Sequence, residues 1–107
     1  MILTLLLKNM QRRLYVLISN KLEPIYGCVQ GGHAVAQWLL DNKDSQTWNN
    51  QYLIYLSADI EKWKLKLEIK EISFSYFKEP DLDNELTAIA VETSSEIFQK
   101  LHPITIR

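Results

Sequence analysis

The sequence contains a single cysteine, Cys28, and only three glycines and three prolines among its 107 residues. A lone cysteine excludes an intramolecular disulfide and a zinc site built from several cysteines, and it is typical of a reducing compartment. The low glycine and proline content, together with 47% hydrophobic residues, excludes a disordered or low-complexity chain. A chain of this length has room for one core, so we expect residues 1–107 to form a single domain.

The sequence also lacks an excess of positive charge and a long hydrophobic run. Its formal net charge is −1, with 12 basic and 13 acidic residues, which argues against a strongly basic nucleic-acid-binding protein. No segment approaches the ~20 apolar residues that span a bilayer. The apolar residues 1–7 have neither a basic region before them nor a cleavage site after them. We therefore expect a cytoplasmic chain without membrane contact, in which residues 1–9 are an appendage to the fold.

Four segments have apolar or alternating patterns that are typical of strands: residues 14–19, 52–57, 72–77 and 86–91. A helical pattern over residues 25–40, with Pro24 suited to its first turn, separates the first two strands and predicts a βαβ unit with parallel strands. The short loop at residues 79–84 predicts an antiparallel hairpin between the last two strands.

Two further helices are predicted after the second strand. Residues 59–70 alternate like a strand, but they are rich in the helix formers Leu, Lys and Glu, and Asp59 can cap a helix. Thr93 and Glu96 have the spacing of a capping box, which predicts a last helix through Leu101. The expected fold class is therefore α/β, a small four-stranded mixed β-sheet with helices packed on both faces.

All three glycines, Gly27, Gly31 and Gly32, fall inside the first predicted helix, where each costs about 1 kcal/mol relative to alanine. Either they let the helix lie close to the sheet, or a ligand approaches the backbone near Gly31 and Gly32. We favour close packing, which predicts that a bulky residue at Gly32 would overpack the core. His33 follows among apolar residues, a setting typical of a hydrogen-bonded core histidine.

Four acidic residues crowd into the loop before the last strand: Glu79, Asp81, Asp83 and Glu85. The loop lacks the length and the glycine of a calcium-binding loop, and the two histidines lack metal-ligand spacing, so no metal site and no cofactor are predicted. The loop is either a solvated turn or a site in which Asp81 turns inward beside the first helix. In the second case Thr87 brings a hydroxyl to the same place.

Three stretches together are similar to the type 2 peptidyl-tRNA hydrolase family: the strand YVLISN at residues 15–20, the helix motif CVQGGHAVA at 28–36, and residues 81–90, which end in LTAIA. The box EPD with NELTAIA further resembles a compact, divergent branch of that superfamily. The resemblance covers about residues 14–91. It implies a mixed four-stranded sheet between helices, and hydrolysis of the ester that joins a peptide to tRNA.

Carried over position by position, the resemblance marks Gln30, His33, Asp81 and Thr87, and Tyr26, Lys21 and Asn84 complete the expected site. Four of them are assigned to catalysis: Asp81, Thr87, Gln30 and Tyr26. Three are assigned to substrate binding: Lys21, His33 and Asn84. Tyr26 stands where the family has a lysine, and either Tyr26 or Lys21 would replace that lysine.

The sequence is compatible with two functions from different classes. The first is a peptidyl-tRNA hydrolase in which Asp81 orients or deprotonates the attacking water. The second is a non-catalytic binding module of the same fold for RNA, a small ligand or a protein partner. Binding to tRNA would be weak, because few phosphates are neutralised. It would involve Lys21 together with Lys62, Lys64, Lys66 and Lys70, unless these lysines only solvate a helix face. Whether the chain forms a homodimer is also open.

Overall fold

The computed structural model describes residues 12–45, 47–93 and 96–104. In chain order its elements are β1 (Arg13–Ser19), α2 (Pro24–Asp41), β2 (Leu53–Ala58), α3 (Ile60–Ile69), β3 (Ser75–Glu79), the short 3₁₀ helix η1 (Pro80–Leu82), β4 (Glu85–Thr93) and β5 (His102–Pro103). The expected α/β fold is confirmed.

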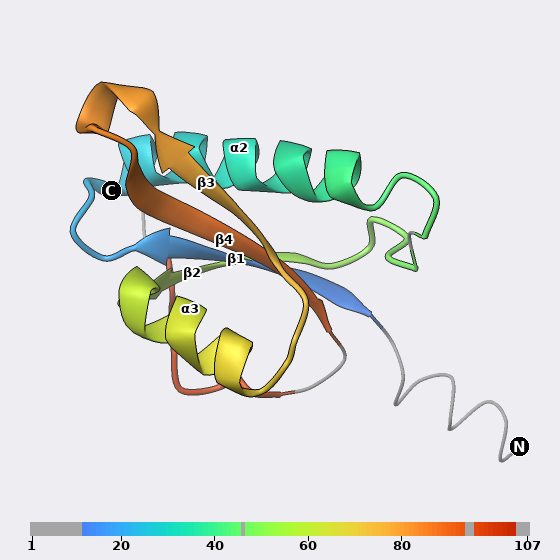
Figure 1. The fold of residues 1–107 in the computed structure, drawn as a ribbon. Coiled ribbons are helices and arrows are strands. Elements are labelled where there is room, and N and C mark those ends of the chain that lie inside the picture. Colours follow the sequence, from blue (N-terminus) through green and yellow to red (C-terminus); the bar gives the residue numbers. More distant parts are fainter. Residues whose placement is uncertain (1–11, 46, 94–95, 105–107) are drawn as a thin grey trace, which may run out of the picture.

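The strands form one mixed sheet in the order β3-β4-β1-β2-β5. β1 and β2 are parallel, and α2 connects them, as the βαβ pattern predicted. β3 and β4 pair antiparallel through the predicted hairpin, and β4 also pairs antiparallel with β1. Figure 1 shows α2 on one face of the sheet and α3 on the other, so helices cover both faces as expected.

The predicted count of four strands is wrong, because the described residues contain a fifth. β5 is only two residues long and pairs with Leu56 and Ser57 at the edge of β2. Such a short segment has no alternation that a sequence pattern could reveal. The third strand also begins later than predicted, at Ser75, because the chain before it is still in the turn that ends α3. In that turn Glu71 has φ 57° and the N–H of Ile72 donates to the Leu67 carbonyl at 3.0 Å.

The predicted last helix is wrong as well. Thr93, its expected cap, is the last residue of β4 and pairs with Arg13, and residues 96–101 form turns. Phe98 explains the difference, because it is buried and its ring packs against Tyr15 at 4.9 Å between centroids. A tertiary contact of a large aromatic side chain here overrides the local capping signal.

Residues 59–70, whose alternation resembles a strand, contain the helix α3, as their helix-forming residues predict. Asp59 caps α3 and accepts a hydrogen bond from the backbone N–H of Lys62 at 3.4 Å. The helix buries Ile60 and Leu67 and leaves Leu65 exposed. The strand-like alternation was therefore coincidental, since a strand would have placed Leu65 and Leu67 on the same side.

Two apolar cores lie on the two faces of the sheet. The core under α3 is the larger and contains Tyr15, Leu17, Leu56, Ala58, Ile60, Leu67, Leu86, Ile89, Val91 and Phe98. The core under α2 has fewer buried residues and contains Leu14, Val16, Ile18, Ala34, Trp38, Ala88 and Ala90. Small residues on this second face allow α2 to lie close to the strands.

Gly27 and Gly31 are the points of closest approach between α2 and the sheet. A Cβ atom on Gly27 would lie 2.5 Å from Ile18 Cγ2, and one on Gly31 would lie 2.6 Å from Ile18 Cδ1 and 2.7 Å from Tyr55 Cε2. Close packing therefore explains these two glycines. The expectation for Gly32 is wrong, because a Cβ atom there would meet nothing within 4 Å.

We predict that Gly31→Ala destabilises the fold by about 1–3 kcal/mol, because the new methyl group has no space among buried side chains. Urea unfolding at low protein concentration measures the loss. The matched control is Gly32→Ala, which adds the same methyl group to the same helix in open space. Equal unfolding midpoints for Gly31→Ala and the wild type would contradict the packing argument.

Candidate functional site

The predicted site lies where the first turn of α2 meets the β3–β4 hairpin. Glu23 caps α2, and its carboxylate accepts hydrogen bonds from the backbone N–H groups of Ile25 at 3.2 Å and Tyr26 at 3.1 Å. Partial desolvation raises the pKa of the Tyr26 phenol, and the negative charges of Glu79 and Asp81 raise that pKa further. Tyr26 and Asp81 therefore lie near each other, and both are exposed.

Gln30 and Thr87 form a buried hydrogen-bonded pair between α2 and β4. The Thr87 hydroxyl lies 2.7 Å from Gln30 Oε1, to which it donates, and 3.3 Å from the carbonyl oxygen of Phe77. The exposed fraction is 1% for Gln30 and 0% for Thr87. Thr87 reaches α2 because of a β-bulge: Leu86 pairs with Lys78 and Ala88 with Phe77, which leaves Thr87 as the extra residue.

The four residues assigned to catalysis thus fall into two groups. Gln30 and Thr87 are together and enclosed, whereas Asp81 and Tyr26 lie on the surface beside the hairpin. A buried amide needs a partner, and the Thr87 hydroxyl satisfies the Gln30 oxygen. This hydrogen bond is a sufficient reason for a glutamine and a threonine at these two buried positions. Their roles in ester hydrolysis stay predictions.

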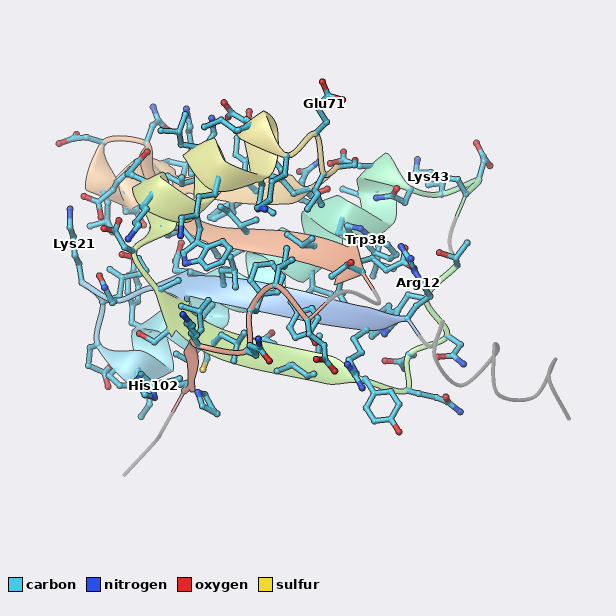
Figure 2. The ribbon with its side chains drawn as sticks, turned by 90° about the horizontal axis from the view of Figure 1, so that it is seen from below. Arg12, Lys21, Trp38, Lys43, Glu71 and His102 are labelled. Carbon is cyan, nitrogen blue, oxygen red and sulfur yellow. The ribbon has the colours of Figure 1, made fainter. Side chains whose placement is uncertain are left out.

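The three residues assigned to substrate binding have separate environments. His33 is exposed and stacks on Phe77, with 4.4 Å between ring centroids, so it is not the core histidine that its neighbours suggested. Lys21 extends from the turn after β1 (Figure 2). Asn84 has a left-handed backbone with φ 62° and donates its N–H to the Glu79 carbonyl at 2.9 Å. Asparagine tolerates this conformation, which accounts for its place in the turn.

The hairpin end of the molecule is negatively charged. Its exposed carboxylates include Asp81, Asp83 and Glu85, and within the described ranges neither ion pair of the chain involves any of them. No group of three or more metal-ligating side chains occurs among the described residues. This end can attract a cation or a hydrogen-bond donor, but it repels phosphate.

A second candidate site lies on the other side of the sheet, between α3 and residues 96–101. Two adjoining hollows of about 380 Å³ each share Trp63, Lys66 and Ile97 in their linings. We call this depression the α3 groove. The lysines that line it are Lys62, Lys66, Lys70 and Lys100. Sequence spacing indicated the first three, but nothing in the sequence placed Ile97 and Lys100 beside them.

Trp63 forms the centre of the α3 groove. Its ring packs on the buried Phe98 at 5.0 Å between centroids, and Lys66 Nζ lies 4.7 Å from the centroid of the indole. Lys64 belongs to the lysine group that the sequence predicts, but it does not line the groove. Its Nζ is 2.6 Å from Glu68 Oε1 and 5.9 Å from the centroid of the Tyr76 ring. The predicted lysine cluster is therefore divided between two faces of α3.

We predict that Thr87→Val lowers the free energy of unfolding by about 1–3 kcal/mol, because the buried Gln30 amide loses its partner. The double variant Gln30→Leu/Thr87→Val should recover much of that loss, since neither polar group remains. Chemical denaturation of both single variants and the double variant gives the coupling free energy. Strictly additive losses would contradict a structural pair.

The comparisons with known proteins bear on the fold alone. No family model and no curated protein matches the chain. A solved structure of a protein of unknown function from Agrobacterium tumefaciens strain C58 is similar, with a TM-score of 0.61 and 12% sequence identity. The match covers 84% of this chain and 92% of that one. No helix within the described ranges is long and apolar enough to cross a membrane. The chain thus shares its α/β fold with that protein over most of both chains.

Proposed function

We propose that this chain is a non-catalytic binding module that takes single-stranded RNA in the α3 groove. The observation that supports it most is the lining of the groove, in which four lysines and the carboxylate of Glu96 accompany Trp63. Proteins that bind single strands combine a positive groove with aromatic side chains on which bases stack. Trp63 offers such a ring, and its contact with Phe98 holds it in a fixed orientation.

In the part of the chain that the structure describes, the lysines of the α3 groove have no ion-pair partner. Lys62, Lys66 and Lys70 follow one another at four-residue spacing, so their like charges repel along one edge of α3. Neither ion pair within the described ranges includes them. A phosphate backbone along α3 would relieve this repulsion. Lys66 has a flexible side chain, which can leave the indole for a phosphate when a base takes its place.

The charge distribution favours this groove over the hairpin end. An ester hydrolase acting on tRNA must attract phosphates and stabilise a developing oxyanion, and both need positive charge. At the hairpin, the negative charges of Glu79 and Asp81 act on Tyr26 instead. Gln30 and Thr87, the two polar groups that could steady a substrate carbonyl, are enclosed. Peptidyl-tRNA hydrolysis and a cytoplasmic location stay predictions from the sequence.

We predict that the protein binds a single-stranded oligoribonucleotide weakly and in a salt-dependent way, with a slope of about −2 to −3 in log K against log salt if three or four phosphates are contacted. Lys66→Gln/Lys70→Gln should weaken binding about tenfold or more at low salt. Trp63→Phe keeps the packing on Phe98 and should weaken binding by reducing stacking. Fluorescence anisotropy of a labelled strand measures both effects.

The matched control is Lys43→Gln, which removes one positive charge from the loop after α2. Lys43 and Lys21 lie at opposite ends of the molecule in Figure 2. Lys62→Gln is the single-charge variant in the groove to compare with it. If both single variants bind the strand equally well, the attraction is a general property of the surface. That result, or no binding at low salt, would contradict the proposal.

We predict that the purified protein cleaves no peptidyl-tRNA ester above the uncatalysed rate, and that Asp81→Asn leaves RNA binding unchanged. Asp83→Asn is the control, because it removes a neighbouring carboxylate from the same turn. Release of labelled peptide from a model peptidyl-tRNA measures cleavage. Cleavage that Asp81→Asn abolishes and Asp83→Asn preserves would establish the hydrolase instead.

A further inference from the structure

The outward face of α2 is apolar along its whole length. The row opposite the sheet consists of Ile25, Val29, Gly32, Ala36, Leu39 and Leu40. Ile25 and Val29 are each 55% exposed and Leu40 is 58% exposed. The exposed polar residues of the helix lie to one side, where His33 stacks on Phe77 and Asp41 accepts a hydrogen bond from Ser75 at 2.7 Å. A helix that is apolar on both its inner and its outer face is normally covered on both.

Gly32 lies at the middle of this outward face and has no function within the fold. A Cβ atom on Gly32 would meet nothing within 4 Å, so alanine would fit and would stabilise the helix by about 1 kcal/mol. Gly27 and Gly31, by contrast, are required by contact with the sheet. A mid-helix glycine that faces outward allows another backbone to come close. The covering element is therefore one that approaches α2 near Gly32.

The order of residues along the face indicates what that element is. When two copies of α2 pack antiparallel, positions whose numbers add to 65 face each other. Ile25 then meets Leu40 and Val29 meets Ala36, which are apolar pairs, and the small Gly32 stands opposite the larger His33. Such a row is self-complementary under a two-fold axis perpendicular to the helix between residues 32 and 33. We propose that α2 packs antiparallel against α2 of a second copy of this chain, with Gly32 at the crossing point.

In this pair, each large side chain near one end of α2 meets a large one near the other end of the partner helix. Ile25 packs on Leu40 of the partner subunit, and the reverse contact is its symmetry mate. Val29 packs over Ala36 of the partner subunit, where the small residue leaves space. Within α2 only Asp41 is charged, so no charge is buried near the axis. The inference is independent of RNA binding.

The size of the apolar face of α2 is suited to a weak dimer. Ile25, Val29, Leu39 and Leu40 are between 39% and 58% exposed, so together they present on the order of a few hundred Å² of apolar surface per protomer. With the small residues between them, the pair buries on the order of 1,000 Å² in total, the lower limit for a specific interface. We therefore expect a dissociation constant in the micromolar range.

Sedimentation equilibrium of the full chain, from about 1 to several hundred micromolar, tests the proposal. The wild type should be in monomer–dimer equilibrium, and Val29→Glu or Leu40→Glu should weaken the dimer at least about tenfold, because each buries an unpaired charge. The matched control is Leu65→Glu on α3, since Leu65 is also 58% exposed. A monomeric wild type at every concentration, or equal weakening by Leu65→Glu, would overturn the proposal.

Gly32→Gln separates association from folding. Because position 32 is exposed and a Cβ atom there meets nothing within 4 Å, the variant should unfold at the same or higher urea concentration than the wild type when both are dilute. The same side chain should prevent close approach at the crossing point and weaken the dimer. A Gly32→Gln variant that dimerises like the wild type would contradict the assigned crossing point.

Disulfide cross-linking tests the antiparallel register. In a Cys28→Ser background, Gly32→Cys lies beside its own copy across the axis and should form a covalent dimer on oxidation. Leu40→Cys should not, because antiparallel α-helices place its two copies about 20 Å apart. Mixing Leu40→Cys with Ile25→Cys should give the heterologous cross-link. Efficient self-linking of Leu40→Cys would indicate a parallel pair and overturn the arrangement.

Discussion

The position of α2 on the sheet depends on the direct contact between its backbone and β1. Gly27 and Gly31 lie so close to Ile18 that neither position has space for a methyl group, and this distance fixes the height of α2 above the sheet. At that height Gln30 reaches β4, and His33 lies over Phe77 of β3. The same close packing turns the opposite row of α2 away from the molecule. The packing of the inner face therefore decides which row of α2 points outward.

The bulge at Thr87 determines what kind of site the hairpin end can be. One extra residue in β4 turns the Thr87 hydroxyl toward α2, where it satisfies the buried Gln30 amide. Two of the positions on which the resemblance to peptidyl-tRNA hydrolases depends thus have a sufficient reason in packing. Gln30 and Thr87 are therefore not, by themselves, evidence for ester hydrolysis.

Sequence patterns predicted most of the fold because its central elements are long and strongly patterned. The two apolar runs and the helix between them gave the parallel unit, and Asp59 correctly indicated the start of α3. The errors came from elements that depend on distant contacts: β5, and the turns that Phe98 holds in place of a helix. The site was predictable only in part. Lysine spacing indicated one wall of the α3 groove, but Ile97 and Lys100 reach it through tertiary structure.

The two proposed surfaces are compatible because α2 and α3 cover opposite faces of the sheet (Figure 1). A dimer formed through α2 leaves both α3 grooves open on its two outer sides. Each groove alone offers few lysines, and the net charge of the chain is −1, so the affinity of one groove for an RNA strand is limited. Two grooves in one particle can engage one strand at two points, and the second contact then forms at a high effective concentration. Weak association through α2 would in this way compensate for a weak basic groove, provided that the strand is long enough to reach around the dimer.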